Sequence, residues 1–361
     1  MLEVIGIGSV DDLYKDVPES VRLKGDYDLP PSQSEMEIRR RLDQLGKLNK
    51  QLVCFAGAGV YDHYTPAIIP QIVERSEYLT SYTPYQAEIS QGTLHYIFEY
   101  QTMMARLTGM EVSNASMYDG ATATAEAALM MVAATKKTHR VVVSDGLDPK
   151  VQEVVSTYAH FHGIELVTLP TNGGTTDCST LGATLAEGGV AGVIVQQPNR
   201  YGIIEDFSGL ADRCHKAKAL LAINSVAADL ALLKTPGEWG ADIAVGEGQS
   251  LGIPMSWGGP YIGYMCTTEK LMRKMPGRIV GQTVDQDGKR AFVLTLQARE
   301  QHIRRQRATS NICSNESLMA LWVTIYMAAM GPNGLREATQ MGCDGAHYLH
   351  DRLLGTGHFS D

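Results

Sequence analysis

From about residue 120 to residue 265 the chain alternates helical segments with short apolar runs, and this alternation constrains the fold more than any other feature. A helix of small residues precedes the first run, and further helical segments separate those that follow. The predicted strands lie at 140–143, 164–169, 192–197, 220–224, 241–245 and 261–265. Strands joined by helical crossovers pair in parallel. The sequence therefore predicts an α/β fold with a wound, mainly parallel sheet, whose ligands would lie outside the carboxyl ends of the strands.

Capping residues mark where several helices begin and end. Ser34 followed by Glu37 predicts a capping box. Asp148 with Pro149 at the first helical position predicts a second start, and Gly109 predicts the end of the helix that precedes it. We expect the last ninety residues to be mostly helical. The predicted parts are an N-terminal helical arm at 1–80, a large α/β domain at 81–304 and a smaller C-terminal domain at 305–361.

Charge and cysteine usage exclude several classes of protein. Acidic residues outnumber Lys plus Arg by 40 to 31, which argues against nucleic acid as the main partner. No window approaches ~18 consecutive apolar residues, so we expect no membrane span. The six cysteines form no CxxC pair, the ten histidines are scattered, and the N-terminus is acidic. These features predict a reduced cytoplasmic protein without a metal site.

Two glycine-containing stretches are candidate sites. Residues 114–122 open a helix, and free N–H groups at its start could hold an anion. The alternative is plain capping of the helix by Ser116 or Asp119. Capping is favoured, because neither a Walker A nor a GxGxxG pattern is present. Residues 246–252 follow a strand and are dense in glycine, which indicates tight turns or close approach of the backbone to another group. A structural loop is the alternative for this second stretch, and a site is moderately favoured.

Two further stretches carry tyrosines and arginines. Tyr82 and Tyr85 flank Thr83 and Pro84, a pattern that suits a substrate pocket as well as a half-buried turn. The basic run at 299–307 could bind carboxylate or phosphate, but most of its arginines are better explained as a solvated face.

Together these stretches resemble the family of the glycine cleavage system P-protein, and specifically its subunit 1 where the protein is divided into two chains. The resemblance covers nearly the whole chain. It is carried by FAGAGVYDHYTPAII (55–69), YTPYQAEISQGTL (82–94), NASMYDGATATAEA (114–127), GEWGADIAVGEGQSLGIPMSWGGPYIG (237–263) and MPGRIVGQTVDQDGKRAFVLTLQAREQHIRRQRATSNIC (275–313). It implies a fold-type-I pyridoxal-phosphate assembly that decarboxylates glycine and passes the aminomethyl group to the lipoyl arm of the H-protein.

The resemblance also draws attention to a lysine that this chain lacks. Catalytic chains of this fold carry a Schiff-base lysine in the turn after a strand such as 241–245, and this chain has Gln249 there. An amide forms no imine, so the resemblance implies that a lysine-bearing subunit 2 binds pyridoxal phosphate covalently. Asn224 replaces an expected aspartate, and Asp148 replaces a usual histidine before proline. Arg307 replaces a usual lysine.

We therefore expect an α₂β₂ heterotetramer in which this chain lends residues to its partner's pocket. The expected roles are catalytic for Tyr82 and Tyr85, cofactor phosphate binding for Thr309, Ser310 and Asn311, and substrate or H-protein binding for Arg278 and Arg304. One alternative is an independent pyridoxal-phosphate enzyme that uses Lys234. Another is a non-catalytic scaffold or regulatory partner of subunit 2. Family members are longer, and from this we expect the C-terminal domain to be incomplete.

Overall fold

The computed structural model describes residues 1–50, 52–53, 59–135, 138–308 and 310–360. The chain forms two compact units, 1–57 and 58–361. In the first unit the described elements are α1 (Leu2–Ile5), η1 (Val10–Tyr14), η2 (Glu19–Val21) and α2 (Glu35–Gly46). The predicted capping box at the start of α2 is confirmed, because Ser34 N donates to Glu37 Oε2 and Glu37 N donates to Ser34 Oγ. Division of the chain at 80/81 and 304/305 stays a prediction.

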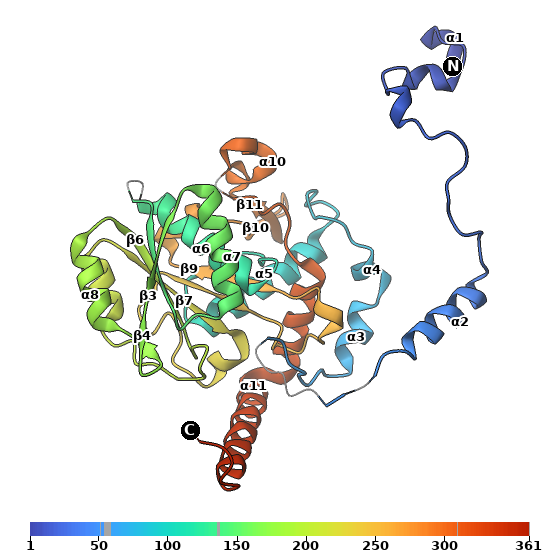
Figure 1. The fold of residues 1–361 in the computed structure, drawn as a ribbon. Coiled ribbons are helices and arrows are strands. Elements are labelled where there is room, and N and C mark those ends of the chain that lie inside the picture. The colour runs from blue at the N-terminus through green and yellow to red at the C-terminus, as the bar shows by residue number, and fades with distance from the viewer. Residues whose placement is uncertain (51, 54–58, 136–137, 309, 361) are drawn as a thin grey trace. The chain divides into compact units, whose positions relative to one another are not determined.

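A seven-stranded sheet forms the centre of the second unit, in the order β1-β9-β8-β7-β6-β2-β3 (Figure 1). The strands are β1 (Val112–Ser113), β2 (Arg140–Ser144), β3 (Glu165–Leu169), β6 (Val190–Gln196), β7 (Leu220–Val226), β8 (Ile243–Glu247) and β9 (Gly263–Thr267). The five adjacent strands β3, β2, β6, β7 and β8 pair in parallel, whereas β9 runs antiparallel to both β8 and β1. The predicted α/β fold with a mainly parallel sheet is confirmed.

Both faces of the sheet are covered by helices. The helices of this layer system are α5 (Gln91–Thr108), α6 (Gly120–Thr135), α7 (Pro149–His162), α8 (Cys178–Glu187) and α9 (Leu210–Lys216). Neighbouring residues of β2 pack into the hydrophobic cores on opposite faces of the sheet. Val143 packs with α6 and α7, while Val142 packs with α8 and α9. Side chains that alternate between faces explain why the strands read as continuous apolar runs. A small hairpin of β4 (Thr171–Asn172) and β5 (Thr175–Thr176) and the turn η3 (Ala227–Ala231) complete this region.

The last ninety residues are mostly helical, as expected, but an unpredicted β-hairpin interrupts them. Strands β10 (Ile279–Val284) and β11 (Arg290–Thr295) pair antiparallel, and Gly288 takes a positive φ of 76° in the turn between them. The hairpin docks on α5 through Gln101, whose side chain donates to the Val280 carbonyl and accepts from the Val280 N–H. The signal was available, because Asp287-Gly288 between two runs rich in β-branched residues is typical of a hairpin.

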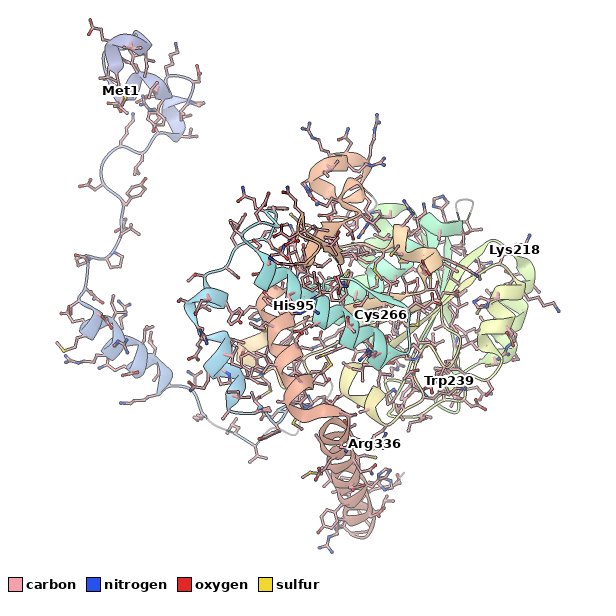
Figure 2. The ribbon with its side chains drawn as sticks, turned by 180° about the vertical axis from the view of Figure 1, so that it is seen from behind. Met1, His95, Lys218, Trp239, Cys266 and Arg336 are labelled. Atoms are coloured by element: carbon pink, nitrogen blue, oxygen red, sulfur yellow. The ribbon has the colours of Figure 1, made fainter. Side chains whose placement is uncertain are left out.

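Helix α11 (Ser317–Leu354) is kinked where Gly331 takes a φ of 61° before Pro332. Its first half packs in the core with buried Leu321, Val323 and Tyr326. By length and apolar composition α11 could cross a membrane, but a core helix passes the same test. Its second half, which begins near Arg336 in Figure 2, leads away from the sheet. The remaining helices and turns are α3 (Ile68–Val73), α4 (Ser76–Leu79), η4 (Ser256–Gly258), η5 (Glu269–Lys274), η6 (Gln297–Arg299), α10 (Gln301–Arg304) and η7 (Arg305–Arg307).

Candidate functional site

The glycine-rich turn after β8 lies against the start of α6 at the carboxyl edge of the sheet. A Cβ atom on Gly120 would stand 2.8 Å from the backbone N of Glu247. Gly246 has a φ of 156°, and a Cβ there would stand 1.8 Å from the Ser225 carbonyl oxygen. The glycines therefore permit close approach of the backbone, as the sequence predicted. What they bring together is the chain's own β7, β8 and α6.

The Glu247 carboxylate lies at the junction of these segments. Oε2 accepts from Gly120 N at 2.9 Å, and Oε1 accepts from Gln249 N at 3.0 Å and from Ile262 N at 3.4 Å. Burial raises the pKa of Glu247 to about 7, although the three backbone donors act in the opposite direction. Glu247 was not among the site residues predicted from the sequence, where its only signal is its place inside the glycine-rich stretch at 246–252.

Asp119 and Ser116, the two capping residues considered for the start of α6, have different roles. The Asp119 carboxylate accepts from Thr122 N at 2.7 Å, which is the capping alternative considered for this stretch. Ser116 has a different role, since its Oγ accepts from the Glu316 N–H at 2.9 Å and so ties α11 to this loop.

Gln249 occupies the position where the resemblance places a lysine in catalytic chains, and its side chain is fully engaged. It is 3% exposed, and Nε2 donates to the carbonyl oxygens of Tyr61 at 3.0 Å and Ile253 at 2.6 Å. The amide of Asn224 donates to Thr124 Oγ1 at 2.6 Å. Lys234, the alternative lysine, places its ammonium 3.7 Å from the centroid of the Trp239 ring. These residues do not fit pyridoxal phosphate bound as an imine at this turn.

Replacing Gln249 with methionine is expected to lower the free energy of unfolding by about 1–3 kcal/mol, because the Tyr61 and Ile253 carbonyls would lose a buried donor at unchanged side-chain volume. Chemical denaturation of the purified chain measures the difference. Gln71→Met, at an exposed glutamine on α3, is the control for loss of an amide at the surface. An equal effect of both substitutions would contradict the structural role assigned to Gln249.

A second cluster brings together Tyr85 and Arg278, two of the residues predicted from the sequence. Arg278 is 2% exposed. It donates through Nη2 to the Tyr85 hydroxyl at 2.8 Å and through Nη1 to Ser314 Oγ at 3.0 Å, and its guanidinium stands 5.0 Å from the centre of the Tyr85 ring. Tyr85 itself is 46% exposed. A buried cation thus orients a tyrosine ring that reaches the surface.

Glu300 provides the charge that compensates Arg278. Its Oε2 lies 3.8 Å from Arg278 Nε and 3.5 Å from His302 Nδ1. Burial raises the pKa of Glu300, while Arg278 and then His302 lower it. Arg278 Nε and Glu300 Oε1 have no hydrogen-bond partner among the described residues. Glu300 was not identified from the sequence, because it lies within a basic run that resembled a solvated face.

The other predicted site residues are not assembled with this cluster by any described contact. Tyr82 is 85% exposed, and Asn311 and Arg304 are also exposed. Arg304 Nε donates to the Ala298 carbonyl at 2.9 Å. Ser310 Oγ accepts from Ile312 N at 3.0 Å, and the same side chain forms a hydrogen bond with the buried Glu126. Thr309 lies outside the described residues.

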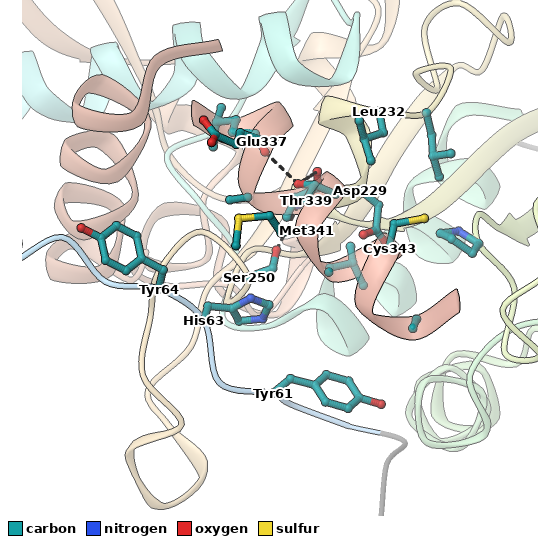
Figure 3. A pocket seen from close by; sticks show the side chains of 18 of the residues that line it. Tyr61, His63, Tyr64, Asp229, Leu232, Ser250, Glu337, Thr339, Met341 and Cys343 are labelled. Atoms are coloured by element: carbon teal, nitrogen blue, oxygen red, sulfur yellow. Dashed lines mark hydrogen bonds between the residues drawn. The ribbon is translucent and has the colours of Figure 1, made fainter. Parts of the chain in front are cut away.

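An apolar pocket of about 990 Å³ opens beside the carboxyl ends of β6 and β7 (Figure 3). Its walls come from residues 61–64, from the segment after β7 and from the second half of α11. Asp229 lines it, and burial raises the pKa of this carboxyl to about 6. Figure 3 shows His63, Ser250 and Cys343 around the same space. No group of three or more His, Cys, Asp or Glu that could hold a metal ion occurs in the part of the chain that the structure describes.

Comparison with known proteins gives a consistent result. The family model described as "Glycine cleavage system P-protein" matches residues 1–358. The probable glycine dehydrogenase (decarboxylating) subunit 1 of Moorella thermoacetica is 52% identical over 98% of this chain and 79% of its own length. The corresponding subunit of Bacillus pumilus is 50% identical over 100% of this chain and 81% of its own length.

Solved structures agree with these sequence relatives. An inhibitor-bound glycine decarboxylase (P-protein) of the glycine cleavage system superposes with a TM-score of 0.90 at 44% identity, covering 98% of this chain and 80% of that one. Mouse CSAD, at 13% identity and a TM-score of 0.64, shares the fold alone.

Proposed function

The chain belongs to the glycine cleavage system P-protein family, and from this we propose that it works as subunit 1 of a two-chain glycine dehydrogenase (decarboxylating) by lending residues to a pocket of subunit 2. The observation that carries the proposal is the pairing of the buried Arg278 with the half-exposed Tyr85. The chain has no lysine in its own turn at 246–252, where Gln249 is fully engaged. A lysine of subunit 2 would therefore bind pyridoxal phosphate.

The chain's own residues would position and bind rather than carry the cofactor. The hydroxyl of Tyr85 is fixed by Arg278, which leaves its ring available at the surface. Tyr82, at 85% exposed, has the freedom to reach into a partner's pocket. The buried Arg278 supports substrate binding through Tyr85, whereas Arg304 is exposed and could attract the glycine carboxylate or the H-protein. Ser310 and Asn311, with Thr309 beside them, are proposed to approach the partner's cofactor phosphate.

We expect the double substitution Tyr82→Phe and Tyr85→Phe to lower glycine–bicarbonate exchange in the reconstituted tetramer by about tenfold or more, because both hydroxyls are removed while the rings stay. Isotope exchange measures the rate. Tyr348→Phe, at a tyrosine 68% exposed on α11, is the matched control. Unchanged exchange in the double variant would remove the tyrosines from the site.

The assembly and its partners are part of the same proposal. We expect an α₂β₂ tetramer that transfers the aminomethyl group to the lipoylated H-protein in the cytoplasm. The described cysteines are all free, which supports a reducing compartment. Co-purification with subunit 2, followed by a decarboxylation assay with lipoylated H-protein, tests the proposal as a whole. Failure of the two chains to associate would contradict it.

A scaffold is the second candidate function, and the engaged side chain of Gln249 favours it. On this alternative the chain only stabilises subunit 2 or docks the H-protein. The exchange activity of subunit 2 alone discriminates the two functions. Full activity without this chain would support the scaffold, and partial or absent activity would support the shared site.

A further inference from the structure

We propose that the apolar pocket beside the carboxyl ends of β6 and β7 binds an organic cation, with the apolar body of the ligand along its walls and an ammonium group against the Asp229 carboxylate. Among the described residues, neither Tyr85 nor Arg278 lines this pocket. The proposal therefore goes beyond the proposed function and does not depend on it.

The size and the walls of the pocket suit the apolar body of a small molecule. Its volume of about 990 Å³ lies within the range of small-molecule sites, about 300–1,000 Å³. Leu232, Leu335 and Met341 are among the apolar side chains that line it. Tyr326, which is 3% exposed, adds an aromatic ring. These walls would bury the hydrocarbon part of a ligand.

The Asp229 carboxylate lies in this pocket without a partner of its own. The neighbouring residue is fixed on both sides, because Ala228 N donates to Ser250 Oγ at 3.0 Å and the Ala228 carbonyl accepts from Thr339 Oγ1 at 3.0 Å. No hydrogen bond or ion pair to the carboxylate itself occurs in the part of the chain that the structure describes. Figure 3 shows its side chain among those that surround the space. Burying a charge without a partner is costly, and a bound cation would remove that cost.

The charges around the pocket select a cation. Asp62 and Glu337 are exposed lining residues that add negative charge to that of Asp229, and no lysine or arginine occurs among the described lining residues. His63 and His347 also line the pocket, and burial lowers the pKa of His63, so that this imidazole is neutral at pH 7.5. Such a field attracts an ammonium group and repels a carboxylate. An amine without an acid group therefore fits, whereas an amino acid such as glycine does not.

Three ligands with the same hydrocarbon chain separate the effect of charge from that of apolar contact: octylamine, octanol and octanoate. At pH 7.5 the amine is protonated, since its pKa is close to that of lysine at about 10.4. The Asp229 carboxyl is then mostly ionised, because its pKa is about 6. In calorimetric titrations of the full chain we expect octylamine to bind about tenfold or more tightly than octanol, through a charge-assisted hydrogen bond. Octanoate and glycine should bind more weakly than octanol, and equal affinities of octylamine and octanoate would overturn the proposal.

The variant Asp229→Asn tests the carboxylate, because it keeps the side-chain volume and removes the charge. We expect its affinity for octylamine to fall by about tenfold or more while its affinity for octanol is unchanged. Asp212→Asn, at an exposed aspartate on α9, makes the same change in net charge and should alter neither affinity. Circular dichroism checks that each variant is folded. Equal losses in the two variants, or undiminished octylamine binding by a folded Asp229→Asn chain, would contradict the proposed contact.

Cys343 locates the ligand without any variant, so the test stands even if Asp229→Asn does not fold. Cys343 lines the pocket and is partly buried, whereas Cys313 is exposed and does not line it. Saturating octylamine should slow alkylation of Cys343 by iodoacetamide about threefold or more, and leave Cys313 unaffected. Mass spectrometry measures both rates. Unchanged alkylation of Cys343 would overturn the proposal, and the result is independent of the exchange assays that test the shared site.

Discussion

We expect Arg278→Met to lower the free energy of unfolding by about 3–5 kcal/mol, since Glu300 would be left buried without its compensating cation. Arg278 is 2% exposed and Glu300 is 5% exposed, so water cannot replace the lost partner. The substitution also removes the donors that hold the Tyr85 hydroxyl and Ser314 Oγ. Chemical denaturation of the purified chain measures the loss.

Two further variants separate loss of charge compensation from loss of volume. In Arg278→Met with Glu300→Leu neither charge remains, and we expect the double variant to regain most of the stability lost by Arg278→Met alone. Arg273→Met, at an exposed arginine, should change stability by less than about 0.5 kcal/mol. A double variant no more stable than Arg278→Met would show that buried charge is not the cause.

The second large effect concerns pH. Glu126 on α6 is 2% exposed, and burial raises the pKa of its carboxyl to about 7 while a hydrogen bond with Ser310 acts in the opposite direction. A group with a raised pKa in the folded state stabilises the fold fully below its unfolded pKa and loses that contribution as pH rises through the folded value. We therefore expect the free energy of unfolding to fall by about 3 kcal/mol between pH 4.5 and 7 through Glu126 alone.

Two other carboxyls add to the same trend. Burial raises the pKa of Glu247 to about 7 and that of Asp229 to about 6, so both also favour the folded state at the acidic end of this window. Glu126→Gln should flatten the pH dependence by the share that Glu126 contributes, whereas Glu153→Gln at an exposed position should leave it unchanged. Urea denaturation at several pH values measures the slope. A slope unaltered by Glu126→Gln would contradict the assignment.

The regular elements of the sheet were largely predictable from the chain. Burial on both faces produces continuous apolar runs, which is why β2, β6 and β7 were found from sequence. Capping at Ser34 and Asp148 was also predicted correctly, because a cap depends only on residues two or three positions apart. The β10–β11 hairpin was not predicted, although Asp287-Gly288 carries its turn signal, because helical segments surround it.

For the candidate site, the sequence predicted individual residues but not their contacts. The stretches that carry Tyr85 and Arg278 were identified from residue types and from resemblance, but the pairing of the two was not, because they are 193 positions apart in the chain. Glu247, Glu300 and Glu126 were missed for the same reason. From sequence alone a glutamate is expected at the surface, and only the tertiary structure shows that these three are buried or partly buried.

The sequence by itself determined the parallel α/β architecture, the helix caps, the family resemblance and the presence of glutamine at the expected lysine position. Each of these follows from residue type and from spacing along the chain. Only the tertiary structure decided that Gln249 is engaged by the Tyr61 and Ile253 carbonyls, that Glu247 accepts from the start of α6, and that Arg278 is buried against Tyr85. The physical reason is that hydrogen bonding, desolvation and charge compensation depend on which distant segments meet, and the sheet and its crossovers determine that meeting.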